Sequence, residues 1–148
     1  MGTRSTIALE FADGTVEQVY AHWDGYLENN GRILQEHYSD PFKLRDLIDL
    51  GAISSLKPEV GEKQDFDKRE TQNKNWTLAY ARDRGEELCI NKFKDLKDYY
   101  ENLDGEEFDY ILSPRNGKPQ WYVRFRTSEG NWIPIEHAFE QNAITEEN

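Results

Sequence analysis

The order of strand-like and helix-like segments is the feature that most limits how this chain can fold. The first segment alternates apolar residues with polar or small ones at the period of a β-strand, at Ile7, Leu9 and Phe11. A turn follows at residues 12–14, where glycine adopts positive φ without steric cost. These signals predict a β-hairpin over residues 4–23.

Helix signals follow the hairpin. Residues 26–38 carry apolar or small residues at i, i+4, i+7 and i+11, which lie on one stripe of a helix. Asp40 and Pro41 favour the start of a second helix, because aspartate accepts from free N–H groups and proline needs no donor there. A third helical pattern covers residues 92–103. We therefore expect about three helices.

The other ordered segments are predicted to be short strands. Their ranges are 76–81, 108–112, 120–127 and 132–135, and residues 88–90 are a weaker candidate that the order below does not count. Residues 57–75 combine proline, glycine and many charged side chains, so they are predicted to form a mobile loop. Residues 141–148 are polar and are predicted to fray.

The resulting order of elements is ββααβαβββ. Strands and helices do not alternate regularly, so a doubly wound parallel sheet is not expected. The order favours an α+β fold in which the helices pack on one face of an antiparallel sheet. A length of 148 residues is typical of one domain, and we predict a single domain over residues 1–148.

The chain is strongly acidic. It contains 29 Asp and Glu residues and 18 Lys and Arg residues, which gives a formal net charge of −11. Such a surface repels nucleic-acid phosphates and anionic lipid headgroups, so direct binding to nucleic acid or to a membrane is not expected. It suits a protein partner that is basic or that itself binds nucleic acid. The alternative is that the charge only maintains solubility.

Signals for location favour the cytoplasm. The N-terminus lacks the charged and apolar regions of a signal peptide, and no apolar run approaches the roughly 20 residues that span a bilayer. Cys89 is the only cysteine, so no intrachain disulfide can form. The apolar neighbours of Cys89 predict a buried, inert thiol.

Motifs for common chemistries are absent from the sequence. There is no Gly-rich phosphate loop, no HExxH pair and no G-x-S-x-G elbow. The three histidines, His22, His37 and His137, lie far apart in the chain. We therefore predict no catalytic residues, no metal site and no cofactor.

Four candidate binding residues lie where the predicted hairpin runs into the first helix. They are His22, Trp23, Asp24 and Tyr26. Strand ends that lead into a helix start are common binding positions, because the helix start offers free N–H groups and a partial positive charge. The alternative is structural, with Asp24 as a helix cap and both aromatic side chains in the core.

A second candidate group lies on segments that can share a sheet. Arg82, Asp83 and Arg84 close a predicted strand, and Arg124 and Arg126 lie on a later one. Guanidinium groups bind phosphate or carboxylate through paired hydrogen bonds, so these residues suit a basic anion-binding pocket. Alternatively, the charges pair with neighbouring carboxylates.

A third candidate group is an acidic face. Its residues are Glu101, Asp104, Glu106, Glu107 and Asp109. Such runs usually form a solvated surface. An extended acidic run can also mimic a phosphate backbone and occupy the groove of a nucleic-acid-binding protein.

Four motifs carry a resemblance to known proteins. They are RSTIA at residues 4–8, VYAHWDGY at 19–26, ISSL at 53–56 and YARDRGE at 80–86. This pattern resembles an uncharacterised family of small proteins from tailed bacteriophages and prophages. The resemblance implies a phage origin and a location in the host bacterial cytoplasm. It implies no reaction and no catalytic residues.

Two hypotheses for function remain open. The first is a phage-encoded acidic accessory protein that inhibits a host factor, such as a defence protein, by protein–protein binding, including by mimicry of nucleic acid. The second is a small-molecule binder that sequesters a nucleotide signal, with Trp23 and Tyr26 stacking on the base and Arg82, Arg84 or Arg124 holding phosphates. Acid–base chemistry by His22 with Asp24 is a third reading, but no nucleophile or metal pattern supports it, and we predict no enzyme.

Overall fold

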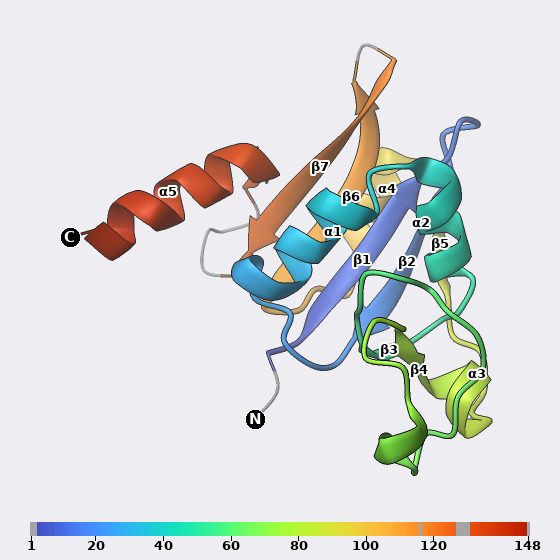
Figure 1. Ribbon diagram of the computed structural model, residues 1–148. Helices are drawn as coiled ribbons and strands as arrows, with labels where there is room; N and C mark the ends of the chain where they lie inside the picture. Colours follow the sequence, from blue (N-terminus) through green and yellow to red (C-terminus); the bar gives the residue numbers. More distant parts are fainter. Residues whose placement is uncertain (1–2, 116, 127–130, 148) are drawn as a thin grey trace.

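One mixed β-sheet organises the molecule (Figure 1). The computed structural model describes residues 3–115, 117–126 and 131–147, and eight strands within them form this sheet. The strands are β1 (Ser5–Glu10), β2 (Val16–Ala21), β3 (Ile53–Ser55), β4 (Leu78–Ala79), β5 (Asn91–Phe93), β6 (Phe108–Arg115), β7 (Lys118–Phe125) and β8 (Trp132–Pro134). Their spatial order is β4-β3-β2-β1-β6-β7-β8, with β5 paired to β2 beside this path.

Most neighbouring strands are antiparallel, as the sequence predicts. β1 and β2 form the expected hairpin, with Ile7 opposite Val19. Two pairs are parallel, β1 with β6 and β2 with β3. Parallel neighbours need a long crossover connection, and helices lie in both of these connections. The sheet is therefore mixed rather than antiparallel throughout.

Five α-helices occur in the described residues, where the sequence predicts about three. They are α1 (Arg32–His37), α2 (Pro41–Ile48), α3 (Tyr80–Arg84), α4 (Leu96–Asn102) and α5 (Ile135–Glu147). A π-helical turn, η1 (Leu27–Gly31), leads into α1, and a 3₁₀ turn, η2 (Arg69–Thr71), lies in the long loop. α1, α2 and α4 confirm the three predicted helices, and α2 begins as expected, because the Asp40 side chain accepts from Phe42 N.

α3 replaces part of a predicted strand. The sequence predicts a strand over residues 76–81, but β4 ends at Ala79 and the chain then turns into a helix. The Asp83 carboxylate accepts from Ala79 N at 2.8 Å, which satisfies a free donor at the helix start. Gly85, with a φ of 76°, ends the helix.

α5 was not predicted, because its sequence is polar. The sequence predicts a strand as far as residue 135 and a frayed tail over residues 141–148, whereas α5 spans Ile135–Glu147. Ile135 and Ala138 are buried and lie three residues apart, so they anchor the first turn of α5 on the core. Residues 127 and 148, at the ends of a predicted strand and of the predicted tail, lie outside the described residues.

Helices cover both faces of the sheet, not one as predicted (Figure 1). α1 and α2 lie over the main core, which includes Leu34, Leu44 and the β1 residue Ile7. α4 lies on the opposite face, where Tyr99 packs near Ala8 in a smaller cluster. Successive strand residues point to opposite faces, so β1 contributes to both clusters.

Candidate functional site

The site begins where the chain leaves β2. His22 N donates to Ile53 O at 2.9 Å and Trp23 N donates to Ser54 O at 3.1 Å, which extends the pairing with β3. The Trp23 side chain is 43% exposed. The His22 ring packs edge-on against it, with the ring centroids 4.6 Å apart. Tyr20 Oη lies 2.7 Å from His22 Nδ1, so a hydrogen bond holds the imidazole in place.

Asp24 has an unusual backbone conformation. Its φ is 55°, and among the described residues it is the only non-glycine residue with positive φ. Its carbonyl oxygen accepts from Asn29 Nδ2 at 3.0 Å and from Asn30 N at 3.3 Å. Gly25 follows in a buried position, where a Cβ would lie 2.7 Å from Ser5 Cβ. Such a conformation costs about 1–3 kcal/mol, so the surrounding contacts must enforce it.

The structural alternatives for this segment are wrong. η1 begins after Tyr26, and no side chain caps it, so Asp24 does not act as a helix cap. Trp23 and Tyr26 are both exposed and neither belongs to the core. Tyr26 does not line the pocket described below.

The next part of the site is a buried brace formed by Arg82 and Asp83. The Asp83 side chain is fully buried and accepts from Gln64 N and Ala79 N, each at 2.8 Å. Arg82 Nε donates to Asp83 Oδ1 at 3.0 Å. The Asp83 carboxylate therefore ties the long loop, through Gln64, to the start of α3.

Arg82 completes this brace. Its Nη1 donates to Val60 O at 2.9 Å and to Gly61 O at 3.2 Å, and its Nη2 donates to Thr77 O at 2.7 Å. All of these Arg82 N–H groups already donate to protein acceptors. Arg82 and Asp83 therefore hold the long loop against α3. Neither of these candidate residues lines the pocket.

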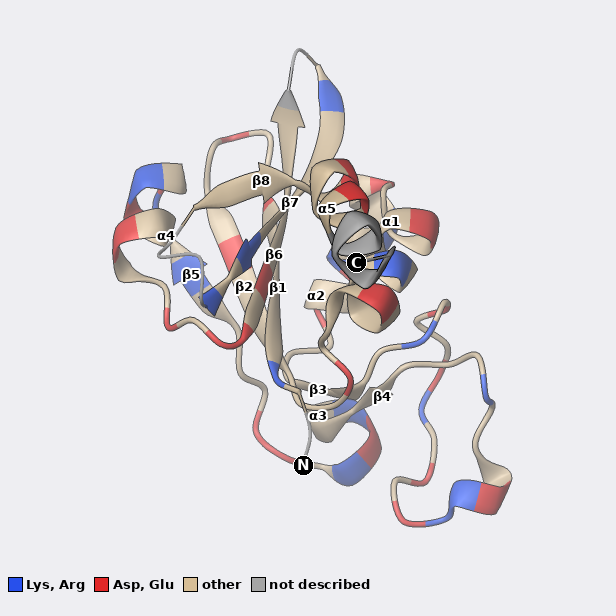
Figure 2. Ribbon diagram, turned by 90° about the vertical axis from the view of Figure 1, so that its left-hand side faces the viewer, with Lys and Arg blue, Asp and Glu red and all other residues tan. Residues whose placement is uncertain are grey.

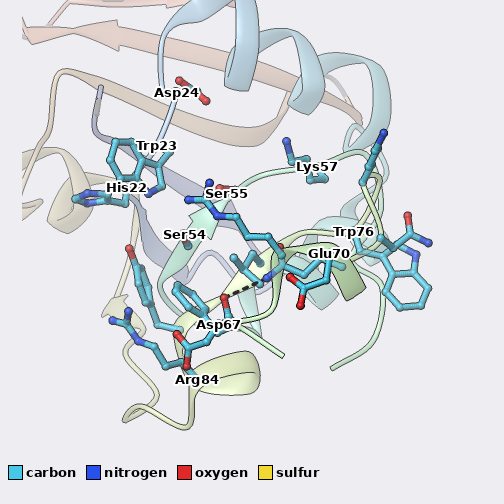
Figure 3. Close-up of a pocket in the computed structure, with 17 residues that line it drawn as sticks. His22, Trp23, Asp24, Ser54, Ser55, Lys57, Asp67, Glu70, Trp76 and Arg84 are labelled. Atoms are coloured by element: carbon cyan, nitrogen blue, oxygen red, sulfur yellow. Dashed lines mark hydrogen bonds between the residues drawn. The ribbon is translucent and has the colours of Figure 1, made fainter. Parts of the chain in front are cut away.

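A pocket of about 1150 Å³ lies between the end of β2 and the long loop (Figure 3). Its walls come from the end of β2, from β3, from the loop over residues 57–76 and from α3. Figure 3 shows His22 and Trp23 on one side, and Lys57 and Trp76 on the other. The structure thus brings His22, Trp23, Asp24 and Arg84 together from the predicted candidates.

Arg84 lies against two aromatic rings that also line this pocket, those of Phe66 and Tyr80. Its guanidinium carbon is 4.5 Å from the Phe66 ring centroid and 4.8 Å from that of Tyr80. Phe66 and Tyr80 stack with centroids 5.6 Å apart, and Arg84 also pairs with Glu86. The ring faces restrict the guanidinium to the pocket wall.

Sequence reasoning missed three basic residues of the pocket. Lys57, Arg69 and Lys74 line it, together with the carboxylates of Asp67 and Glu70. These residues lie in or next to the charge-rich segment predicted to be a mobile loop. Their local pattern contains no binding signal, because only the folded course of the loop brings them beside β2.

The loop follows a defined course in the structure. Gln72 Nε2 donates to Asp65 O at 2.9 Å and to Phe66 O at 3.1 Å. Asn73 N donates to Gln64 Oε1 at 2.7 Å. These bonds hold the two arms of the loop together and present its basic side chains to the pocket.

The remaining arginine candidates lie elsewhere. Arg124 pairs with Asp109 at 2.6 Å, and its guanidinium lies 5.4 Å from the Trp132 ring centroid. Asp109 also accepts from Thr6 Oγ1 at 2.6 Å. Arg124 and the exposed Arg126 are not among the residues that line the pocket, so they do not join Arg82 or Arg84 in one basic pocket, and Arg124 instead pairs with a carboxylate.

The acidic candidates divide into two kinds. Asp109 is completely buried, so its place on an acidic face is wrong. Glu101, Asp104 and Glu107 are exposed, and Glu106 is half-buried. These four residues lie on α4 and on its connection to β6 (Figure 2), and none of them lines the pocket.

Other expectations concern reactive groups. Cys89 is exposed, so the prediction of a buried thiol is wrong. The described part of the chain contains no group of three or more His, Cys, Asp or Glu side chains arranged to hold a metal ion.

No helix of the described residues is long and apolar enough to cross a bilayer.

Comparisons with known proteins leave the site to be interpreted from its own geometry. No protein-family model, no curated protein and no solved structure matches this chain. The resemblance to phage proteins therefore stays a prediction.

Proposed function

We propose that the protein binds a nucleotide in the pocket beside β2 and thereby sequesters it. One observation carries this proposal. Aromatic rings and four basic side chains line the same pocket of a chain whose net charge is −11. Basic residues gathered in one pocket of an acidic protein attract a small anion, while the surface around them repels long polyanions.

The aromatic side of the pocket suits a nucleobase. Trp23 is 43% exposed and its ring lies nearly perpendicular to that of His22, so much of the Trp23 side chain is accessible to a ligand. Stacking of a base on an aromatic side chain contributes roughly 1–3 kcal/mol. The pocket volume of about 1150 Å³ is larger than a bound nucleotide requires.

The basic side of the pocket suits phosphates. Lys57, Arg69, Lys74 and Arg84 line the pocket and outnumber its three carboxylates, Asp24, Asp67 and Glu70. In the described part of the chain, Lys57, Arg69 and Lys74 form no ion pair. Their charges are therefore available to an anionic ligand, and guanidinium groups bind phosphate oxygens through paired hydrogen bonds.

Isothermal titration calorimetry with a panel of mono-, di- and cyclic nucleotides tests this proposal. We expect at least one nucleotide to bind with a micromolar Kd. Trp23→Ala is expected to weaken that binding about 10-fold, because it removes the stacking surface. The double variant Arg69→Ala/Lys74→Ala is expected to weaken it further by removing two phosphate partners.

The matched control is Lys92→Ala/Lys97→Ala, which removes two exposed charges from β5 and α4 that do not line the pocket. This control should bind like the wild type. Absence of heat and of thermal stabilisation with every nucleotide at millimolar concentration contradicts the proposal. Equal losses in the pocket variant and the control also contradict it.

A second proposal is inhibition of a host factor by protein–protein contact. The observation that favours it is the run of exposed carboxylates at Glu101, Asp104 and Glu107, none of which lines the pocket. A basic or nucleic-acid-binding protein complements such a surface. Phage origin and a defence target are the predictions that the sequence resemblance supports.

Charge reversal separates this second proposal from general acidity. Changing Glu101, Asp104 and Glu107 to lysine should abolish retention of a basic bacterial partner on the immobilised protein. Reversal of Asp46, Asp49 and Glu62, which are exposed elsewhere, changes the net charge equally and should leave retention intact. Equal loss in both variants, or no retained protein at low salt, contradicts this proposal.

A further inference from the structure

The Asp24 side chain is an exposed carboxylate on the Trp23 side of the pocket. Within the described residues its carboxylate accepts no hydrogen bond and pairs with no cation. It directly follows Trp23 in the chain, and Figure 3 shows it on the same side of the pocket as Trp23 and His22.

The position of Asp24 is built into the fold. Its φ of 55° is enforced by the bonds from Asn29 and Asn30 to its carbonyl oxygen. Gly25 N also donates to Thr3 O at 2.7 Å, which fixes the next peptide unit. A carboxylate without a partner, held in a sparsely populated conformation next to a stacking surface, is suited to contact a ligand.

Hydrogen-bond chemistry limits which base such a carboxylate selects. An ionised carboxylate only accepts hydrogen bonds, and it accepts two side by side. Guanine presents two adjacent donors, N1–H and the N2 amino group. Adenine, cytosine and uracil each place an acceptor next to their donor, so a carboxylate meets a repulsive lone pair there.

We propose that the pocket selects a guanine nucleotide, with the base stacked on Trp23 and its N1–H and N2 amino group donating to the Asp24 carboxylate. This inference rests on the proposed nucleotide binding. It adds a specificity-determining residue and names the class of ligand.

Calorimetry of the full chain with GDP, IDP and ADP tests the inference. Hypoxanthine in IDP keeps N1–H but lacks the 2-amino group, so the expected order of affinity is GDP, then IDP, then ADP. GDP should bind at least 10-fold more tightly than ADP. Asp24→Asn should lower the GDP affinity at least 10-fold and change the ADP affinity less than 3-fold.

Asp24→Asn is a suitable variant because asparagine also tolerates positive φ, so the backbone keeps its conformation. Asp67→Asn is the matched control, since it neutralises another carboxylate of the same pocket and should preserve the preference for GDP. Equal affinities for GDP and ADP, or equal losses for both in Asp24→Asn, overturn the guanine inference and leave nucleotide binding intact. Failure of all three diphosphates and of the wider nucleotide panel overturns both.

Discussion

Three aspartates illustrate how one residue type takes different roles in this protein. Asp24 has an exposed, unpaired carboxylate at the pocket, and Asp83 is buried under the loop. Asp109 is buried beneath Arg124 on another part of the sheet. In the sequence, each of the three lies among aromatic or charged residues. The local pattern therefore does not distinguish an aspartate that could contact a ligand from one that stabilises the fold. Only the donors around each carboxylate make that distinction.

Removal of the Asp83 carboxylate is expected to destabilise the protein. Asp83→Ala leaves Gln64 N and Ala79 N without their acceptor and deprives Arg82 of its ion-pair partner. Loss of one member of a buried pair costs about 3 kcal/mol. Urea unfolding at neutral pH measures this loss, and trypsin cleavage after lysines and arginines of residues 62–75 should accelerate because the loop loses its tether.

Asp67→Ala is the control for that experiment. Asp67 is an exposed carboxylate of the same loop, so its removal should change the free energy of unfolding by less than about 0.5 kcal/mol. A loss below about 1 kcal/mol in Asp83→Ala, with no change in trypsin sensitivity, would show that the brace does not hold the loop.

Elements with strong local signals could be predicted from the sequence. The first hairpin follows from alternation and its turn, and α2 follows from Asp40, whose side chain accepts from the helix start. α3 and α5 could not be predicted. α3 depends on Asp83, which also binds the distant Gln64, and α5 depends on the burial of its first turn. Tertiary contacts decide both helices.

The candidate site was predictable to a similar degree. His22, Trp23 and Asp24 are consecutive, so a local cluster of functional residue types pointed to them. Arg69 and Lys74 reach the pocket only because the loop between β3 and β4 folds back beside β2. That course depends on hydrogen bonds between residues distant in sequence, which no short motif encodes.

At the scale of the whole molecule, the charges are separated. The basic side chains of the pocket come from α3 and the loop over residues 57–76. The exposed carboxylates of Glu101, Asp104 and Glu107 belong to α4 and its connection to β6, and none of them lines the pocket. A small anion and a basic protein would therefore approach different surfaces, so the two proposed functions do not compete for one site. The interior also contains titratable groups, among them three completely buried tyrosines, Tyr38, Tyr99 and Tyr110.

These buried tyrosines predict that the whole fold loses stability at alkaline pH. Burial is the main cause that raises the pKa of Tyr38 to about 12, and it raises the pKa values of Tyr99 and Tyr110 well above the usual range. An unfolded tyrosine has a pKa of about 10. Between these values the unfolded chain releases protons that the folded chain keeps, so the free energy of unfolding falls as pH rises above about 10.

Tyr38→Phe isolates one of these groups. At neutral pH it loses only the hydrogen bond from Tyr38 Oη to Lys57 O, which costs about 1 kcal/mol. Phenylalanine does not titrate, so only the wild type loses stability as the phenol of the unfolded chain ionises. The greater stability of the wild type over Tyr38→Phe should therefore disappear by about pH 11. Urea unfolding of both proteins from pH 7 to pH 11 measures the difference, with Tyr26→Phe, at an exposed tyrosine, as the control that should follow the wild type. A difference between Tyr38→Phe and the wild type that stays constant over this range would contradict the prediction, because it would mean that the phenol keeps its proton equally in the folded and unfolded chains.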